Sequence, residues 1–135
     1  KLFGVVRSSV SSSSAPAQYI FLKALDSPGY EEQKARFRAI LAERYRQVRD
    51  FLARTKLPAC LRPLPFNSGY FMSFECPGIS TEALRLKLLD EKGIGVISMQ
   101  DRYLRVAFSS VEADQIADLY TEILRAAQSL ADAGR

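Results

Sequence analysis

The segment from Tyr30 to Thr55 constrains the fold of this chain more than any other. Its apolar residues recur every three or four positions, as they do along one face of a helix. These residues are Phe37, Ile40, Leu41, Tyr45, Val48, Phe51 and Leu52. At about 1.5 Å per residue, such a helix would measure about 35–40 Å, which is more than a compact domain of 135 residues needs. We therefore expect it to run between two subdomains.

The residues after the long helix predict a small α+β domain. Three short segments rich in aromatic and β-branched residues indicate strands, namely residues 70–75, 95–98 and 103–108. Ser80 and Gly93 are the predicted N-cap and C-cap of a helix between the first two strands. A capping box at Ser109–Glu112 predicts the start of a last helix. The expected fold class is α+β, with a small three-stranded sheet covered by helices and preceded by the long interdomain helix.

Upstream of the long helix, a run of four serines ends at Ala15–Pro16. A serine run can form a flexible linker, whereas proline is favoured in the first turn of a helix. The apolar residues between Tyr19 and Leu25 favour a short helix that ends before the turn residues Asp26–Gly29. We expect this helix, with a linker as the alternative.

The absence of histidine excludes several classes of active site. Without imidazole the chain can form neither a Ser-His or Cys-His nucleophile pair nor a histidine-ligated metal site. Its two cysteines, Cys60 and Cys76, lie sixteen positions apart and lack the Cys-x-x-Cys spacing of a zinc site, so we expect no metal. Reduced thiols are the rule in the cytoplasm, which is the expected location.

Composition and charge also limit the partners. No apolar run is long enough to span a membrane. The net charge of +4 favours anionic ligands only weakly. Five arginines between residues 36 and 49 give the long helix a basic face, but Glu43 and Asp50 are interleaved with them and no aromatic residue stands out for base stacking. We therefore expect no nucleic acid, and the docking of an acidic protein on this face is an alternative.

Arg105 is the residue that the strand pattern singles out. Period-two alternation puts Leu104, Val106 and Phe108 on one face of their strand. Arg105 then lies on the opposite face, between Tyr103 and Ala107. A charged group among apolar neighbours in a central strand is costly unless it meets an anion. The pattern leaves three possibilities open: an anionic ligand, solvent exposure at a sheet edge, or a pair with Glu75 or Asp101.

Three stretches of the chain resemble the C-terminal part of fold-type I, class I/II pyridoxal-phosphate-dependent aminotransferases. They are Asn67–Phe71 (NSGYF), Leu88–Ser98 (LLDEKGIGVIS) and Arg102–Glu112 (RYLRVAFSSVE). A fourth stretch, Arg7–Gln18, is similar to the segment that leads out of the large domain of these enzymes. The resemblance spans nearly the whole chain and is most specific at residues 103–112.

The resemblance implies a role for Arg105. In the family, an arginine in this strand binds the α-carboxylate of the substrate through a bidentate pair, and Arg105 occupies the matching position. Asn67 and Gly69 match the start of the strand that lies beside the substrate. The resemblance thereby implies amino-group transfer between an amino acid and a 2-oxo acid.

The resemblance also implies a cofactor whose main binding residues this chain lacks. Family members bind pyridoxal 5′-phosphate as a Schiff base on a lysine of the large domain. The lysines after Lys1 lack the matching context, and the family's lysine is expected further upstream than Lys1. Residues 1–29 would be the end of the large domain, 30–56 the interdomain helix and 57–135 the small domain. We expect the isolated chain to be inactive and the parent enzyme to be a homodimer.

Two other interpretations stay open. The chain can be a catalytically inactive, aminotransferase-like domain that senses a small carboxylate through Arg105, or an interaction domain that docks an acidic partner. In the family, the segment matching Ser11–Gln18 approaches the partner subunit. A piece that lacks most of this interface would be monomeric or loosely associated, with the apolar segment Leu2–Val6 exposed.

Overall fold

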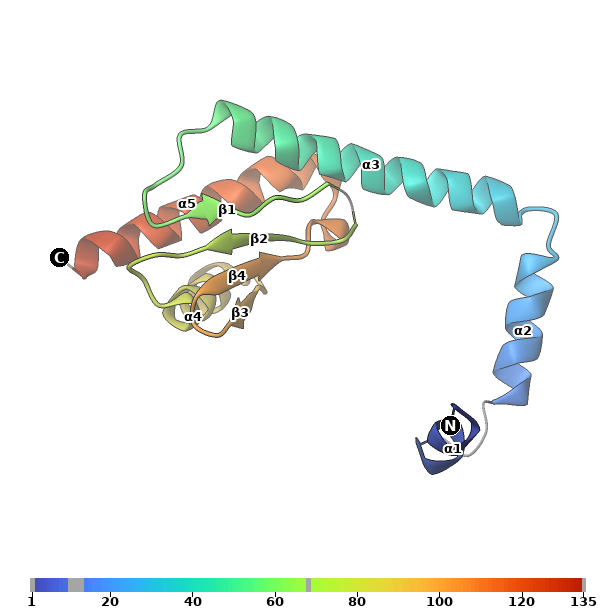
Figure 1. The fold of residues 1–135 in the computed structure, drawn as a ribbon. Coiled ribbons are helices and arrows are strands. Elements are labelled where there is room, and N and C mark those ends of the chain that lie inside the picture. The colour runs from blue at the N-terminus through green and yellow to red at the C-terminus, as the bar shows by residue number, and fades with distance from the viewer. Residues whose placement is uncertain (1, 10–13, 68, 135) are drawn as a thin grey trace. The chain divides into compact units, whose positions relative to one another are not determined.

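The structure is a computed structural model that describes residues 2–9, 14–67 and 69–134 (Figure 1). The chain divides into two compact units, Lys1–Arg38 and Ala39–Arg135, which we call the N-terminal and C-terminal units. Of the predicted features, most of the serine run, residues 11–13, lies outside the described residues. No helix within the described ranges is long and apolar enough to cross a membrane.

Two short helices precede the long one in the N-terminal unit. α1 spans Leu2–Ser9, and α2 spans Ala15–Leu25 with Pro16 in its first turn. α2 ends at Asp26, whose backbone N–H donates to the Leu22 carbonyl at 3.1 Å. The predicted short helix is therefore confirmed, whereas the alternative of a linker concerns the serine run, of which residues 11–13 lie outside the described residues.

Several apolar side chains of the N-terminal unit are exposed. Tyr19, Ile20, Phe21 and Leu22 of α2 are each more than half exposed, as is Leu2 of α1. Exposed apolar side chains gathered on one helix usually mark a surface that another element covers. The expectation that the start of the chain exposes apolar residues is met for Leu2.

The long helix α3 runs from Tyr30 to Arg54, one residue short of its predicted end. Its buried stripe lies in the part that belongs to the C-terminal unit. There Val48 is fully buried, and Tyr45, Phe51 and Leu52 pack against the same core. The predicted helix and the C-terminal half of its apolar stripe are confirmed.

Four strands form one antiparallel sheet in the C-terminal unit, in the order β1-β2-β4-β3. They are β1 (Arg62–Pro63), β2 (Met72–Glu75), β3 (Ile97–Met99) and β4 (Tyr103–Val106). The α+β class is confirmed, but the predicted number of three strands is wrong because β1 adds an edge strand. With only two residues, one of them proline, β1 is too short to show an alternating pattern. Proline fits there because one side of an edge strand needs no hydrogen-bond donor.

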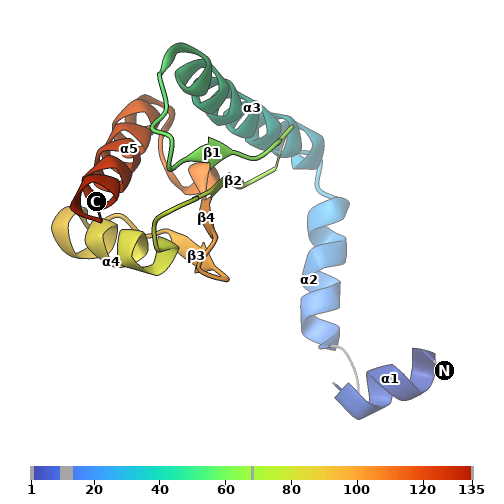
Figure 2. The same ribbon diagram turned by 60° about the vertical axis from the view of Figure 1, so that its left-hand side comes forward.

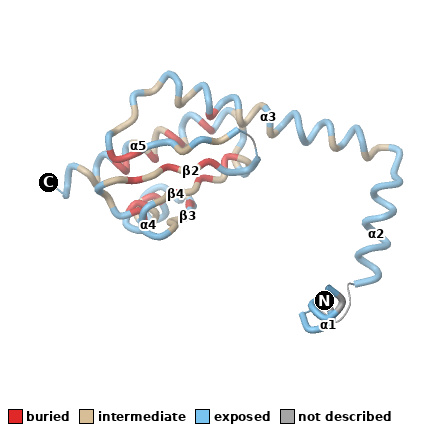
Figure 3. Tube along the Cα trace, viewed as in Figure 1, coloured by how far each residue is buried: buried red, intermediate tan, exposed pale blue. Residues whose placement is uncertain are grey.

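Helices cover one face of this sheet (Figure 2). On that face Met72 and Phe74 of β2 pack with Leu104 and Val106 of β4, and each is at most 1% exposed. The covering helices are α4 (Thr81–Lys92), α5 (Ile116–Ala133) and the last turns of α3. They contribute the buried residues Val48, Leu84, Leu88, Ile116, Tyr120, Ile123 and Ala127. The buried positions accordingly gather between the sheet and these helices (Figure 3).

The two ends of α4 are capped as the sequence predicts. The Ser80 hydroxyl accepts a hydrogen bond from the Ala83 N–H at 3.2 Å. Gly93 ends the helix in the left-handed conformation, with φ of 65°, which glycine adopts without steric cost. This conformation confirms that Gly93 is a helix cap, as its position after the helix indicates.

The last helix begins later than its predicted capping box. Residues 108–110 and 113–115 form two 3₁₀ turns, and α5 begins only at Ile116. The polar groups of the box are used elsewhere: Arg44 of α3 donates to the Ser109 carbonyl and also to the Glu112 carboxylate, at 2.9 Å. The Ser109 N–H donates to the Tyr70 carbonyl at 3.3 Å. The predicted start at Ser109–Glu112 is wrong because these long-range contacts outcompete the local cap.

Asp101 connects the β3–β4 hairpin to the start of α4. It lies in the turn with a φ of 46°, next to Gln100 with a φ of 55°. Its carboxylate accepts hydrogen bonds from the Ser80 hydroxyl at 2.8 Å and from the Glu82 N–H at 3.0 Å. The Glu82 N–H and then the Ser80 hydroxyl lower the pKa of Asp101 below its ordinary value of 3.8. A charge on the hairpin thus stabilises the positive end of the helix.

The substitution Asp101→Asn tests this contact through its dependence on pH. Asparagine keeps an acceptor oxygen and tolerates positive φ, so only the charge is removed. Because the pKa of Asp101 is lowered by folding, its charge stabilises the fold above pH 3.8, and this stabilisation is lost as the pH falls through the lowered pKa. We expect urea unfolding to show that the variant is less stable than the wild type at pH 7. The difference in unfolding free energy between the two should disappear in acid. A difference that does not depend on pH would contradict this role.

The substitution Tyr120→Phe tests an unsatisfied group in the core. Tyr120 is fully buried between Phe51 and Phe74, at ring-centre distances of 5.8 and 6.2 Å. Its hydroxyl has no hydrogen-bond partner among the residues described, and burial raises its pKa well above 10. Removing the hydroxyl should raise the free energy of unfolding by about 1 kcal/mol. Tyr103→Phe, on the other face of the sheet, is the control and should change stability by less than about 0.5 kcal/mol.

Candidate functional site

Arg105 lies in the middle of an internal strand. β4 is flanked by β2 and β3, and Arg105 pairs with Ser73 on one side and Ile97 on the other. Its neighbours Leu104 and Val106 point into the core, so the half-buried Arg105 side chain belongs to the face that α4 and α5 do not cover. The alternative of an arginine in an edge strand is therefore wrong.

The two carboxylates that could have paired with Arg105 have other partners. Glu75 accepts from Arg102, whose Nη2 and Nε lie 2.7 and 3.1 Å from Oε1, and this contact raises the pKa of Arg102. The Asp101 carboxylate accepts hydrogen bonds from Ser80 and Glu82 at the start of α4. Both paired alternatives are therefore excluded.

Within the described residues, the guanidinium of Arg105 has no ion pair. No carboxylate among residues 2–9, 14–67 and 69–134 forms a salt bridge with it, and its Nε is buried with no acceptor in these ranges. A buried donor without a partner costs about 1–3 kcal/mol, and such groups call for an explanation. A bound anion would satisfy this guanidinium.

Phe71 is the aromatic partner of Arg105. The Cζ atom of Arg105 lies 4.6 Å from the centre of the Phe71 ring, which is a cation–π contact. Phe71 directly precedes β2 and lies two residues before Ser73, so it shares the face of Arg105. The sequence pattern did not single it out, although alternation along residues 70–75 would place it on this face.

Asn67 and Gly69 lie in the exposed segment between β1 and β2. Gly69 has a φ of 94°, a conformation that favours glycine, and two residues later the chain reaches Phe71. The structure thus places Gly69 at the entry to β2, close in sequence to the ring that contacts Arg105. Asn67 lies two residues before Gly69 in the same segment.

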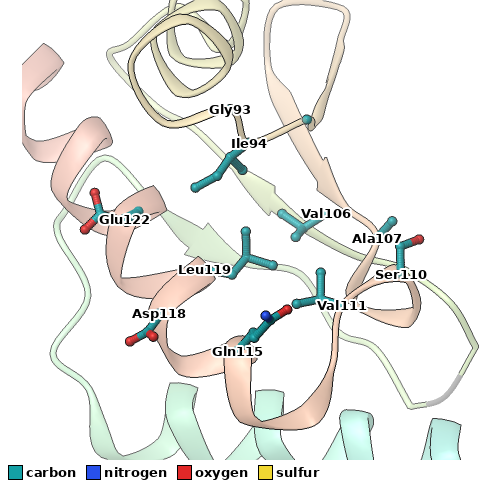
Figure 4. Close-up of a pocket in the computed structure, with 11 residues that line it drawn as sticks. Gly93, Ile94, Val106, Ala107, Ser110, Val111, Gln115, Asp118, Leu119 and Glu122 are labelled. Atoms are coloured by element: carbon teal, nitrogen blue, oxygen red, sulfur yellow. The ribbon is translucent and has the colours of Figure 1, made fainter.

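A pocket of about 520 Å³ lies elsewhere in the C-terminal unit (Figure 4). Its apolar lining comes from the α4–β3 connection, the end of β4 and the start of α5, namely Ile94, Val106, Val111 and Leu119. Val106 is on the core face of β4, whereas Arg105 is on the other face. The carboxylate of Glu122 at its rim is paired with Lys92 and Arg125, which lower its pKa. This pocket therefore contains none of the predicted site residues.

The lysines of the described ranges do not form a cofactor site. Lys34, Lys87 and Lys92 have their ammonium groups in ion pairs of 2.6–3.0 Å with glutamates. The Lys23 ammonium lies over the Tyr19 ring, and Lys56 is exposed. A lysine that forms a Schiff base needs a desolvated or otherwise activated amine, and these five do not have one. The residues present therefore do not fit pyridoxal phosphate by themselves. The same ranges also hold no group of three metal-ligating side chains.

The fold of the chain resembles that of solved aminotransferases. One is the alpha-aminoadipate aminotransferase LysN from Thermus thermophilus, complexed with N-(5′-phosphopyridoxyl)-L-leucine, with a TM-score of 0.78 and 20% identity over 96% of this chain. Another is the Pyrococcus horikoshii kynurenine aminotransferase in complex with PMP, with KYN as substrates and KYA as products, with a TM-score of 0.75 and 15% identity over 91% of this chain. No protein-family model and no curated protein matches the sequence.

These comparisons establish the fold. The chain covers 35% and 32% of the two enzymes, or about a third of their length. The prediction that the chain has the fold of part of an aminotransferase is therefore confirmed. The roles of Arg105, Asn67 and Gly69 stay predictions.

The substitution Arg105→Met tests whether Arg105 serves the fold. Methionine keeps an unbranched side chain. It loses the cation–π contact, worth about 0.5–1 kcal/mol at an exposed site, and removes an unsatisfied donor that costs about 1–3 kcal/mol. We expect urea denaturation to give an unfolding free energy that is unchanged or higher by up to about 1 kcal/mol.

Arg44→Met is the matched control. Arg44 is 14% exposed and donates to Ser109 and Glu112, so its loss should cost about 1–3 kcal/mol. If Arg105→Met is as destabilised as Arg44→Met, the guanidinium of Arg105 has a structural role.

Proposed function

We propose that this chain is the C-terminal portion of a class I/II, pyridoxal-phosphate-dependent aminotransferase and that Arg105 binds the α-carboxylate of its substrate. One observation carries the proposal: a guanidinium in an internal strand, on the face of the sheet that α4 and α5 do not cover, has no carboxylate partner in the described chain. The likeness of the fold to two aminotransferases supports the enzyme class.

Arg105 would bind and orient the substrate. A guanidinium presents N–H donors in one plane and matches the two oxygens of a carboxylate, and such charge-assisted pairs are about twice as strong as neutral hydrogen bonds. A lysine would offer a point charge without this directional match. Holding the carboxylate at Arg105 fixes one end of an amino acid or 2-oxo acid and so restricts where its reacting carbon can lie.

The cofactor chemistry belongs to residues outside this chain. Pyridoxal phosphate, when bound, serves as an electron sink for amino-group transfer. Because the described lysines do not fit it, the proposal places the Schiff-base lysine in another part of the protein and expects the isolated chain to be inactive. We assign residues 1–29 to the end of the large domain, 30–56 to the interdomain helix and 57–135 to the small domain. Asn67 and Gly69 would lie near the substrate.

The exposed apolar side chains of α2 agree with a homodimer. Ile20, Phe21 and Leu22 are each more than half exposed on one short helix, which is typical of a helix that packs against another part of a larger protein or against another chain. We propose that the parent enzyme is a cytoplasmic homodimer. The two buried, reduced cysteines agree with this location.

A carboxylate-sensing domain without catalytic activity is the second candidate function. The same unpaired guanidinium supports it, since binding a carboxylate requires no lysine. A lysine in a cofactor-binding context upstream of this chain would favour the aminotransferase. A parent protein that lacks such a lysine would favour the carboxylate sensor.

The substitution Arg105→Lys tests the proposed function in the full-length enzyme. Loss of the bidentate pair should cost about 2–4 kcal/mol of transition-state stabilisation and thereby lower kcat/KM for the amino acid. The cofactor should still bind, because Arg105 does not hold it. Steady-state kinetics and the cofactor absorbance measure the two quantities.

The decarboxylated amine of the same amino acid is the control substrate. It cannot form the pair, so its rate should change far less than that of the amino acid. Equal losses for the two substrates would show that Arg105 is structural.

A further inference from the structure

We propose that Phe71 is a positioning residue for the substrate carboxylate: its ring holds the guanidinium of Arg105 from one face and leaves the edge of the guanidinium plane free for the ligand. This inference rests on the proposed function of Arg105. It gives a role to a side chain that is 44% exposed although it is a phenyl ring.

The register of the sheet brings the two side chains together. Ser73 pairs with Arg105, so Phe71, two residues earlier on the same face, is a diagonal neighbour of Arg105 across the two strands. Diagonal neighbours lie within reach of aromatic and long side chains. The observed 4.6 Å between Cζ and the ring centre is well inside the limit of about 6 Å for a cation–π contact.

A ring stacked on the guanidinium leaves free the N–H donors that an ion pair with a protein carboxylate would occupy. The N–H donors of a guanidinium point outward in its plane, and a carboxylate of the protein would occupy them. An aromatic ring over the face occupies none of them and excludes water from that face. A ring stacked in this way would therefore order the side chain of Arg105 without using the donors that a substrate carboxylate needs.

The backbone holds Phe71 in place at the entry to β2. The carbonyl of the preceding Tyr70 accepts a hydrogen bond from the Ser109 N–H at 3.3 Å, which ties this segment to the chain that follows β4. The ring of Tyr70 also meets that of Phe71 at 6.4 Å, with an interplanar angle of 64°. The ring of Phe71 is thus positioned by contacts that do not involve Arg105.

The chemistry of the contact defines the variants. Leucine covers part of the same area but has no π system, so Phe71→Leu removes the electrostatic attraction for the cation. Tyrosine keeps the ring, so Phe71→Tyr should retain the positioning effect. Without the ring, the long side chain of Arg105 must be ordered by the ligand itself, and affinity for a carboxylate falls.

The experiment measures carboxylate binding to the 135-residue chain by NMR. Acetate is the probe, with chloride at equal ionic strength as the control for screening. The readouts are the backbone amide signals of β2 and β4 and, where arginine is present, the Nε–H signal of Arg105. We expect Phe71→Leu to weaken acetate binding about two- to fivefold, Phe71→Tyr to bind as the wild type does, and Arg105→Lys to weaken binding at least about tenfold.

The outcomes separate this inference from the proposed function. If Arg105→Lys weakens binding but Phe71→Leu does not, the positioning role is wrong and the carboxylate anchor stands. If acetate causes no shift that depends on Arg105, the anchor is wrong and the positioning role with it. The double variant Phe71→Leu/Arg105→Met should bind no more weakly than Arg105→Met alone, since neither has a cation at position 105, and additive losses would overturn the positioning role.

Discussion

The pairing of β2 with β4 is the constraint on which the C-terminal unit depends. Its register sets Met72 against Val106 and Phe74 against Leu104, and all four side chains are buried against the helices. A slip of one residue would turn all four toward the face opposite α4 and α5, at a cost of about 1.5–3 kcal/mol for each side chain. The same register puts Arg105 on that opposite face. The core therefore determines where the guanidinium points.

Local patterns predicted most of the fold. The apolar period of α3, the caps of α4 and the alternation in β4 are properties of neighbouring residues, and each was found within a residue or two of its place. The errors have a common physical cause, since contacts between distant residues decided them. β1 exists only because residues 62 and 63 pair with β2, and α5 starts late because Arg44, more than sixty residues away in sequence, binds Ser109 and Glu112.

The candidate site also has features that the local sequence predicts and features that depend on contacts between distant residues. Alternation identified Arg105 and the face on which it lies, and this needs only the strand itself. The strand alone could not show whether Arg105 forms an ion pair, because the pattern offered both Glu75 and Asp101 as partners. The decision depends on competition in three dimensions: Glu75 pairs with Arg102, and Asp101 is taken by the start of α4. The contact with Phe71 depends on a register between strands that are far apart in sequence.

The edge strand β1 has a consequence for how the protein behaves among copies of itself. Exposed strand edges present rows of unpaired backbone groups and can recruit strands from other molecules. Here that edge of the sheet is two residues long, and Pro63 has no N–H to offer an incoming strand. Growth of the sheet from this side into an aggregate is therefore disfavoured twice, by the missing N–H of Pro63 and by the exposed charge of Arg62 beside it.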